Sequence, residues 1–179
     1  TLVALPSLDD LYAAEPEEFV AARNALAKQL KAAGDKDTAA EQLAHASRLE
    51  KAGSQRGARR AYDALVHEWG DAPEAAEAQL GVAALHEAAG NLVAAFREYQ
   101  YFIEHYASGA EVNGLGYQKV VEEQFAVANS LRDKLGGGWF SSPDVELVAS
   151  MFRHIVRNAP EWSRAPECMM LEGSAYESE

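Results

Sequence analysis

The chain has 179 residues, of which 48% are hydrophobic, and its formal net charge is −12. This composition is typical of one globular domain or a short solenoid. An acidic chain without a basic stripe is repelled by phosphate backbones and anionic lipid head groups, which argues against nucleic acid and electrostatic membrane docking. The sequence also lacks a run of about 18 apolar residues, so we expect no membrane-spanning helix.

The N-terminal part predicts two helices. The first covers residues 16–33 after a short turn near Ser7, and Pro16 suits its first turn because the missing N–H would have no partner there. The second covers residues 38–52, where Thr38 and Glu41 have the spacing of a capping box.

Two stretches, residues 53–70 and 90–107, then share one pattern with a period of 37 residues. Their large apolar side chains recur at the i, i+3, i+4 and i+7 positions of an amphipathic helix. The equivalent pairs are Tyr62 with Tyr99, Leu65 with Phe102, Val66 with Ile103 and Trp69 with Tyr106. A helical pattern with this period is typical of a helix-turn-helix solenoid, in which each unit covers the apolar side of its neighbour.

Helical patterns fill most of the remaining chain. A helix at 74–89 separates the two copies, and its Gly81 would let a neighbouring helix approach closely. A long helix is expected at 111–134, followed by the glycine-rich stretch LGGGWFSSP, whose aromatic rings, Trp139 and Phe140, we expect to hold the connection in place.

A third copy of the pattern covers residues 144–159, with Phe152 in the place of Tyr99 and Ile155 in the place of Phe102. Residues 165–179 then repeat the beginning of the helix at 74–89, with Gly173 in the place of Gly81. A solenoid normally ends in a polar capping helix, so this ending indicates a truncated repeat domain.

The apolar spacing resembles that of a known repeat class. The positions Gly90, Ala95, Tyr99 and Phe102, and the earlier set Gly53, Ala58, Tyr62 and Leu65, resemble the second helix of tetratricopeptide repeats. Within that superfamily, residues 43–179 resemble the outer-membrane β-barrel assembly lipoproteins of the BamD type. Three phrases carry this resemblance: AYDALVHEWGDAPEAAEAQLGVAALHEAAGNLVAAFREYQYFIEHYA, QKVVEEQFAVANSL, and FSSPDVELVASMFRHIVRNAP followed by SRAPE.

The resemblance implies an all-α, right-handed solenoid of tetratricopeptide-like hairpins at the periplasmic face of the outer membrane. Its implied role is a scaffold that binds nascent barrel proteins or the assembly machinery. Members of the family are anchored through a lipidated N-terminal cysteine, whereas the one cysteine here is Cys168. Membrane attachment would therefore need a lipid anchor that this chain lacks.

Residues 1–42 match nothing in that family and form a separate N-terminal helical extension ahead of the repeat domain at 43–179. They are either a natural extension or a piece joined in an engineered chimera. The second possibility gives an alternative function, an engineered or fused helical scaffold with no natural ligand.

We find in the sequence none of the motifs that are typical of catalytic, metal-binding or cofactor-binding sites. None of the five histidines has the i, i+4 partner of a zinc helix, and one cysteine cannot build a thiolate zinc site. The glycine-rich stretches lack the endings of phosphate-binding loops. We therefore expect no enzyme, no metal and no cofactor, but a protein or peptide partner.

We assign expected roles to two sets of residues. The first forms the core between repeats and comprises Tyr62, Leu65, Trp69, Tyr99, Phe102, Tyr106, Phe152 and Ile155. The second is expected to contact a partner and comprises Gln79, Val82, His86, Tyr101 and Tyr117. Tyr101 lies off the apolar stripe, and an exposed tyrosine offers rigid area with a polar tip at interfaces.

Overall fold

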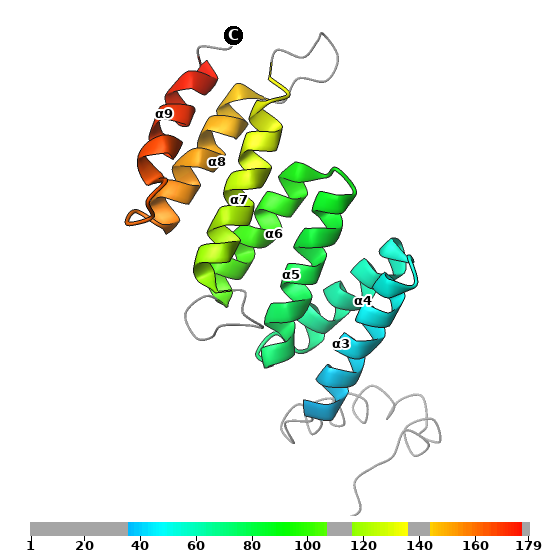
Figure 1. The fold of residues 1–179 in the computed structure, drawn as a ribbon. Helices are drawn as coiled ribbons and strands as arrows, with labels where there is room; N and C mark the ends of the chain where they lie inside the picture. Colours follow the sequence, from blue (N-terminus) through cyan, green and yellow to red (C-terminus); the bar gives the residue numbers. More distant parts are fainter. Residues whose placement is uncertain (1–35, 107–115, 136–143, 177–179) are drawn as a thin grey trace, which may run out of the picture.

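The computed structural model describes residues 36–106, 116–135 and 144–176, and the described ranges form helices joined by turns (Figure 1). The helices are α3 (Lys36–Lys51), α4 (Gln55–Glu68), α5 (Pro73–Ala88), α6 (Leu92–His105), α7 (Tyr117–Arg132), α8 (Val145–Asn158) and α9 (Ala165–Tyr176). The predicted all-α class is thus confirmed over these ranges. The helix predicted at 16–33, the turn near Ser7 and the rings of Trp139 and Phe140 lie outside them.

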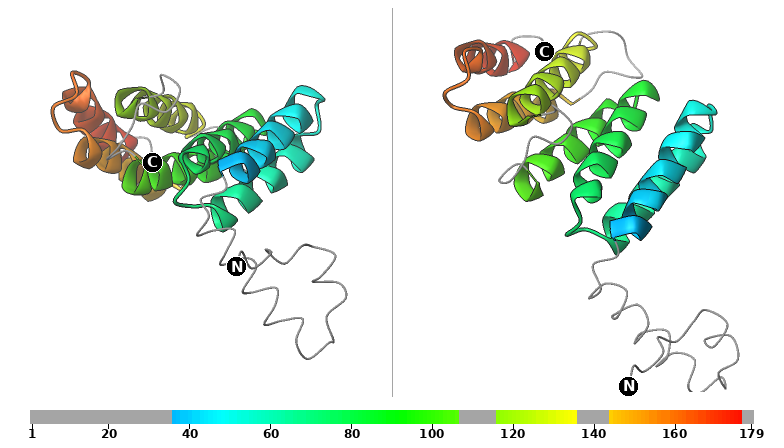
Figure 2. Two further views of the ribbon diagram at one scale, coloured as in Figure 1. Left: turned by 90° about the horizontal axis from the view of Figure 1, so that it is seen from below. Right: turned by 60° about the horizontal axis from the view of Figure 1, so that its bottom comes forward.

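The seven described helices pack in chain order as adjacent antiparallel pairs, and α3 also touches α5. In the views of Figure 2, α3 and α4 lie at one end of the array and α9 lies at the other. Sequential packing of this kind is compatible with helical-hairpin repeats, in which each pair covers its neighbours.

Two predicted helix boundaries are wrong. Helix α3 already includes Lys36, so Thr38 lies inside the helix and does not cap it. A capping-box spacing also fits the first turns of a longer helix, so the motif alone cannot place the start. Helix α7 begins only at Tyr117, because Gly116 has extended backbone angles (φ −67°, ψ 162°) and caps the helix instead of continuing it.

The repeat covers whole hairpins. Helices α3 and α5 begin 37 residues apart, and so do α4 and α6, as their bounds show. The turn inside each hairpin contains a glycine with positive φ, +78° at Gly53 and +75° at Gly90. Ser54 and Asn91 then donate their N–H groups back to the carbonyls of Leu49 and His86. Glycine adopts this left-handed conformation without a Cβ penalty, so both hairpins close in the same way.

The buried side chains form two clusters that meet on α5. One cluster joins α3, α4 and one side of α5, and the other joins the opposite side of α5 to α6, α7, α8 and α9. Helix α5 buries Ala75, Val82 and Leu85 in the first cluster and Leu80 and Ala83 in the second. A helix that is apolar all round is suited to this position between two layers.

Gly81 of α5 permits the close approach of α4 that its sequence position predicts. A Cβ atom built on Gly81 would lie 2.8 Å from Cε2 of the Tyr62 ring, well inside normal contact. The expected equivalence of Gly173 to Gly81 is not reproduced in packing, because a Cβ built on Gly173 meets nothing within 4 Å. The described part of the chain places no ring against α9 at that point.

The tyrosines at equivalent positions make equivalent polar contacts. The hydroxyl of Tyr62 donates to Glu50 over 2.8 Å, and the hydroxyl of Tyr99 donates to Glu87 over 3.0 Å. Both tyrosines are 5% exposed, so their hydroxyls reach from the core to the carboxylate of the preceding helix. The repeat thus also includes a glutamate 12 residues before each tyrosine, which was not predicted from the sequence.

The packing at Gly81 can be tested with a matched pair of alanine substitutions. Gly81→Ala should lower the free energy of unfolding by about 1–2 kcal/mol, because overpacking against the Tyr62 ring outweighs the gain in helix propensity. Gly173→Ala should raise it by about 0.5–1 kcal/mol, since only the propensity changes there. Urea unfolding measures both values, and equal stabilisation by the two substitutions would contradict the contact.

The hydroxyl of Tyr62 should contribute stability that is lost in alkali. Burial raises the pKa of Tyr62 to about 12, above the value near 10 of an unfolded chain. A group whose pKa is higher in the folded state favours folding below its unfolded pKa, and this contribution falls as pH rises from about 10 towards 12. Tyr62→Phe should therefore cost about 1.5–3 kcal/mol at pH 8, the typical value of a hydrogen bond to a charged group.

The check is urea unfolding of the wild-type protein and of Tyr62→Phe at pH 8 and pH 11. Phenylalanine at the equivalent position 152 is 0% exposed, so the ring itself fits without the hydroxyl. The gap in stability between the two proteins should narrow at the higher pH. A constant gap would show that the hydroxyl is not held in its neutral form by the fold.

Candidate functional site

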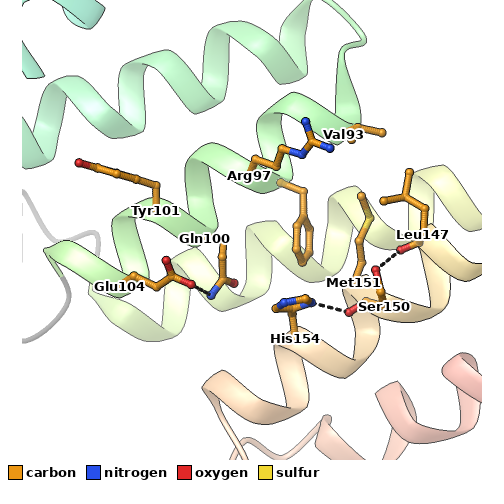
Figure 3. Close-up of a pocket in the computed structure, with 10 residues that line it drawn as sticks. Val93, Arg97, Gln100, Tyr101, Glu104, Leu147, Ser150, Met151 and His154 are labelled. Atoms are coloured by element: carbon orange, nitrogen blue, oxygen red, sulfur yellow. Dashed lines mark hydrogen bonds between the residues drawn. The ribbon is translucent and has the colours of Figure 1, made fainter. Parts of the chain in front are cut away.

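An open groove lies between α6 and α8 (Figure 3) and has a volume of about 250 Å³. Its lining residues recur every three to four positions along α6 and along α8, some as adjacent pairs, so each helix contributes one face. Of its lining side chains, Phe96 and Met151 are buried, whereas Arg97, Tyr101 and Glu104 are exposed, so we call the apolar set the floor and the polar set the rim. The floor comprises Val93, Phe96, Leu147 and Met151, and the rim comprises Arg97, Gln100, Tyr101, Glu104, Ser150 and His154. We call it the apolar groove.

Two polar side chains of α8 beside the apolar groove form hydrogen bonds to the backbone of their own helix. Nδ1 of His154 lies 2.8 Å from the carbonyl oxygen of Ser150, so this nitrogen carries the proton and donates. The hydroxyl of Ser150 in turn donates to the carbonyl of Leu147 over 2.7 Å. With these groups satisfied, the α8 wall offers mainly the apolar side chain of the half-buried Leu147, while Met151 lines the groove but is only 2% exposed (Figure 3).

A second hollow of about 350 Å³ lies on the other side of α6, towards α4. We call it the polar depression. Its lining residues are Asp63, Val66, His67, Gln79, Glu98 and Tyr101. Asp63 forms an ion pair with Arg59 at 3.3 Å. The pKa of Asp63 is raised, mainly by burial and further by the charge of Glu98, against the opposing effect of Arg59.

Tyr101 is the residue that the two hollows share. Its side chain is 40% exposed, which is unusual among the aromatic residues of the described ranges. The ring stacks on His105 with 3.9 Å between ring centroids, and Nδ1 of His105 lies 3.0 Å from the carbonyl of Tyr101. Stacking with a residue one turn along α6 supports one face of the ring and leaves the side chain accessible.

A partly buried amide network connects the helices around the apolar groove. Gln124 of α7 is 0% exposed and donates to Oε1 of Gln100 on α6 over 2.9 Å. Asn158 of α8 donates to the same oxygen over 2.7 Å and to Oε1 of Gln124 over 3.3 Å. Because buried amides are costly to leave unpaired, this network sets how α6 and α8 lie relative to each other.

The structure brings together two of the five residues predicted to contact a partner. Gln79 and Tyr101 line the polar depression, although Gln79 is only 3% exposed. Val82 is 2% exposed in the core cluster of α3, α4 and α5, so it offers no area to a partner. His86 is half-buried, and Tyr117 lines a separate hollow of about 220 Å³ with Trp162.

The residues predicted to form the core between repeats are all buried or half-buried. Tyr62, Leu65, Tyr99, Phe102, Phe152 and Ile155 are buried, and Trp69 and Tyr106 are half-buried against the clusters. The floor of the apolar groove was not predicted. The helical spacing of the lining residues could have indicated one exposed face on α6 and another on α8. The sequence does not show how far apart these two helices lie.

Within the described ranges, no group of three or more His, Cys, Asp or Glu side chains is arranged to hold a metal ion. The same ranges contain no helix that could span a membrane. Cys168 is buried, and burial raises the pKa of its thiol to about 11. Comparisons of the chain with models of protein families, with curated proteins and with solved structures found no match.

If Tyr101 is a surface residue and Tyr99 a packing residue, their alanine substitutions should differ widely in stability. Tyr99→Ala should cost roughly 3–5 kcal/mol, because it removes a buried ring. Tyr101→Ala should change the free energy of unfolding by no more than about 0.5 kcal/mol, as is usual for surface positions. Thermal or urea unfolding gives both values, and a large loss with Tyr101→Ala would place that ring in the core.

Proposed function

We propose that the chain is a non-catalytic interaction scaffold whose apolar groove binds a segment of a partner protein. The observation that carries this proposal is the apolar floor of Phe96, Leu147 and Met151 in an open groove with a polar rim. Binding sites commonly combine an apolar lining with a few polar groups that fix orientation. Tyr101 adds an exposed, rigid aromatic surface at the edge, the kind of side chain that anchors interfaces.

The repeat pattern supports a binding role of this kind. Stacked helical hairpins leave extended surfaces, and proteins built from them commonly use those surfaces for binding. We place the chain among right-handed, tetratricopeptide-like solenoids on the strength of its 37-residue period and its glycine and tyrosine positions. The resemblance of residues 43–179 to BamD-type lipoproteins further suggests a role in outer-membrane β-barrel assembly. Its partners there would be nascent barrel proteins or the assembly machinery.

The proposal can be tested by selecting a displayed library of random 16-residue peptides on the immobilised full chain. Selected peptides should bind the soluble protein with a dissociation constant that increases at least tenfold in Leu147→Glu. A buried leucine anchor is worth about 1.5–3 kcal/mol, and about 1.4 kcal/mol corresponds to a factor of ten. Binding is measured by fluorescence anisotropy, and circular dichroism confirms that the variant remains helical.

Met169→Glu is the matched control. Met169 is 58% exposed on α9, outside the apolar groove, so the same change of apolar side chain to glutamate should leave peptide binding unchanged. Equal binding to Leu147→Glu and the wild-type protein would place the site elsewhere. Failure to select any peptide would favour the alternative, a helical scaffold with no ligand.

A further inference from the structure

The polar depression contains an unused hydrogen-bond acceptor. Gln79 is 3% exposed, and its Nε2 donates both to the Glu98 carbonyl, over 3.1 Å, and to the Glu98 carboxylate, over 2.8 Å. These two acceptors fix the orientation of the amide, because the opposite orientation would set oxygen against oxygen. Both hydrogen bonds use the nitrogen of the Gln79 amide, which leaves its carbonyl Oε1 able to accept one. A ligand that carries an N–H group can donate to this oxygen.

The charge of the polar depression also favours a ligand with hydrogen-bond donors, in particular a cation. Asp63 and Glu98 contribute two carboxylates, and Arg59, which pairs with Asp63, is the cation at hand. Both members of that pair are well exposed, with 39% and 47% of their side chains accessible, so solvent screens their attraction. Burial is the main cause of the raised pKa of Asp63, and the charge of Glu98 raises it further, as expected of two carboxylates that repel each other. A cation bound here would relieve that repulsion.

The rim of the apolar groove does not itself select a charge, because Arg97 and Glu104 have opposite signs. A basic side chain is therefore favoured only on the α4 side, in the polar depression.

The two hollows are neighbours, since the side chain of Tyr101 borders both. In an extended segment, side chains at positions i and i+2 point the same way and lie about 7 Å apart. Two such residues lie on one side of the segment, so each can face one of the two hollows that Tyr101 borders.

We infer that the partner segment carries a lysine or arginine two residues from an apolar anchor, with Tyr101 between them. This inference rests on the proposed function. The apolar side chain fills the apolar groove over Phe96 and Met151. The basic side chain donates to Asp63, Glu98 and Oε1 of Gln79 and lies against the Tyr101 ring, a favourable position for a cation. The acidic chain, with net charge −12, also attracts such a segment at long range.

The test uses synthetic versions of the peptides selected above and two double variants with the same change in net charge. Asp63→Asn with Glu98→Gln removes the carboxylates of the polar depression. Asp133→Asn with Glu161→Gln removes two exposed carboxylates that line neither hollow. Selected peptides should contain Lys or Arg two positions from Leu, Met or Phe. Their affinity should fall about tenfold with the first double variant and less than twofold with the second.

A peptide in which Gln replaces the basic residue should bind the wild-type protein about tenfold more weakly than the original peptide does. The two peptides should bind the Asp63/Glu98 double variant almost equally. Binding that depends on Leu147 but shows no preference for a basic residue would overturn this inference and leave the proposed function intact. Equal losses with both double variants would attribute the effect to net charge and would also overturn it. Binding that is insensitive to Leu147→Glu would instead overturn the proposed function.

Discussion

The fold depends on a tyrosine ring that fills the space beside a hairpin and donates its hydroxyl to a glutamate of the preceding helix. Tyr62 with Glu50 and Tyr99 with Glu87 repeat this contact. A buried phenol needs a hydrogen-bond partner, so the hydroxyl constrains how the two helices of each hairpin are aligned. The ring in turn requires room on the next helix, which Gly81 provides for Tyr62. Packing and polar contact thus act through one side chain.

The third copy of the pattern is held differently. Phe152 is completely buried but has no hydroxyl, so it makes no comparable polar contact. Here the amides of Gln100, Gln124 and Asn158 connect α6, α7 and α8 instead. An amide network is directional, whereas apolar packing alone allows helices to slide, so these hydrogen bonds define the relative positions of α6 and α8. The shape of the apolar groove therefore depends on this amide network, to which the lining residue Gln100 belongs, and not only on the apolar side chains.

Local patterns predicted much of the fold, because a helix and its buried face are properties of residues near one another in sequence. The 37-residue period and the spacing around Tyr62 and Tyr99 predicted α4 and α6 and placed helical hairpins side by side. Boundaries were less predictable, as the extended backbone of Gly116 shows. The site was harder still. Val82 was expected at the surface, but α5 is covered on both sides, and the apolar groove depends on the separation of two helices that are not adjacent in the chain.

Positions 64 and 101 show how a repeat can acquire a binding surface without disturbing its core. They are equivalent in the 37-residue period, and both are exposed, yet one is alanine and the other tyrosine. Positions 62 and 99, two residues earlier, are both tyrosine because each ring is buried and hydrogen-bonded. Packing therefore restricts the residue at the inner position and leaves the outer one free to change. Since α6 has neighbours on both sides, a large side chain at position 101 borders two hollows, and a change there alters recognition at little cost in stability.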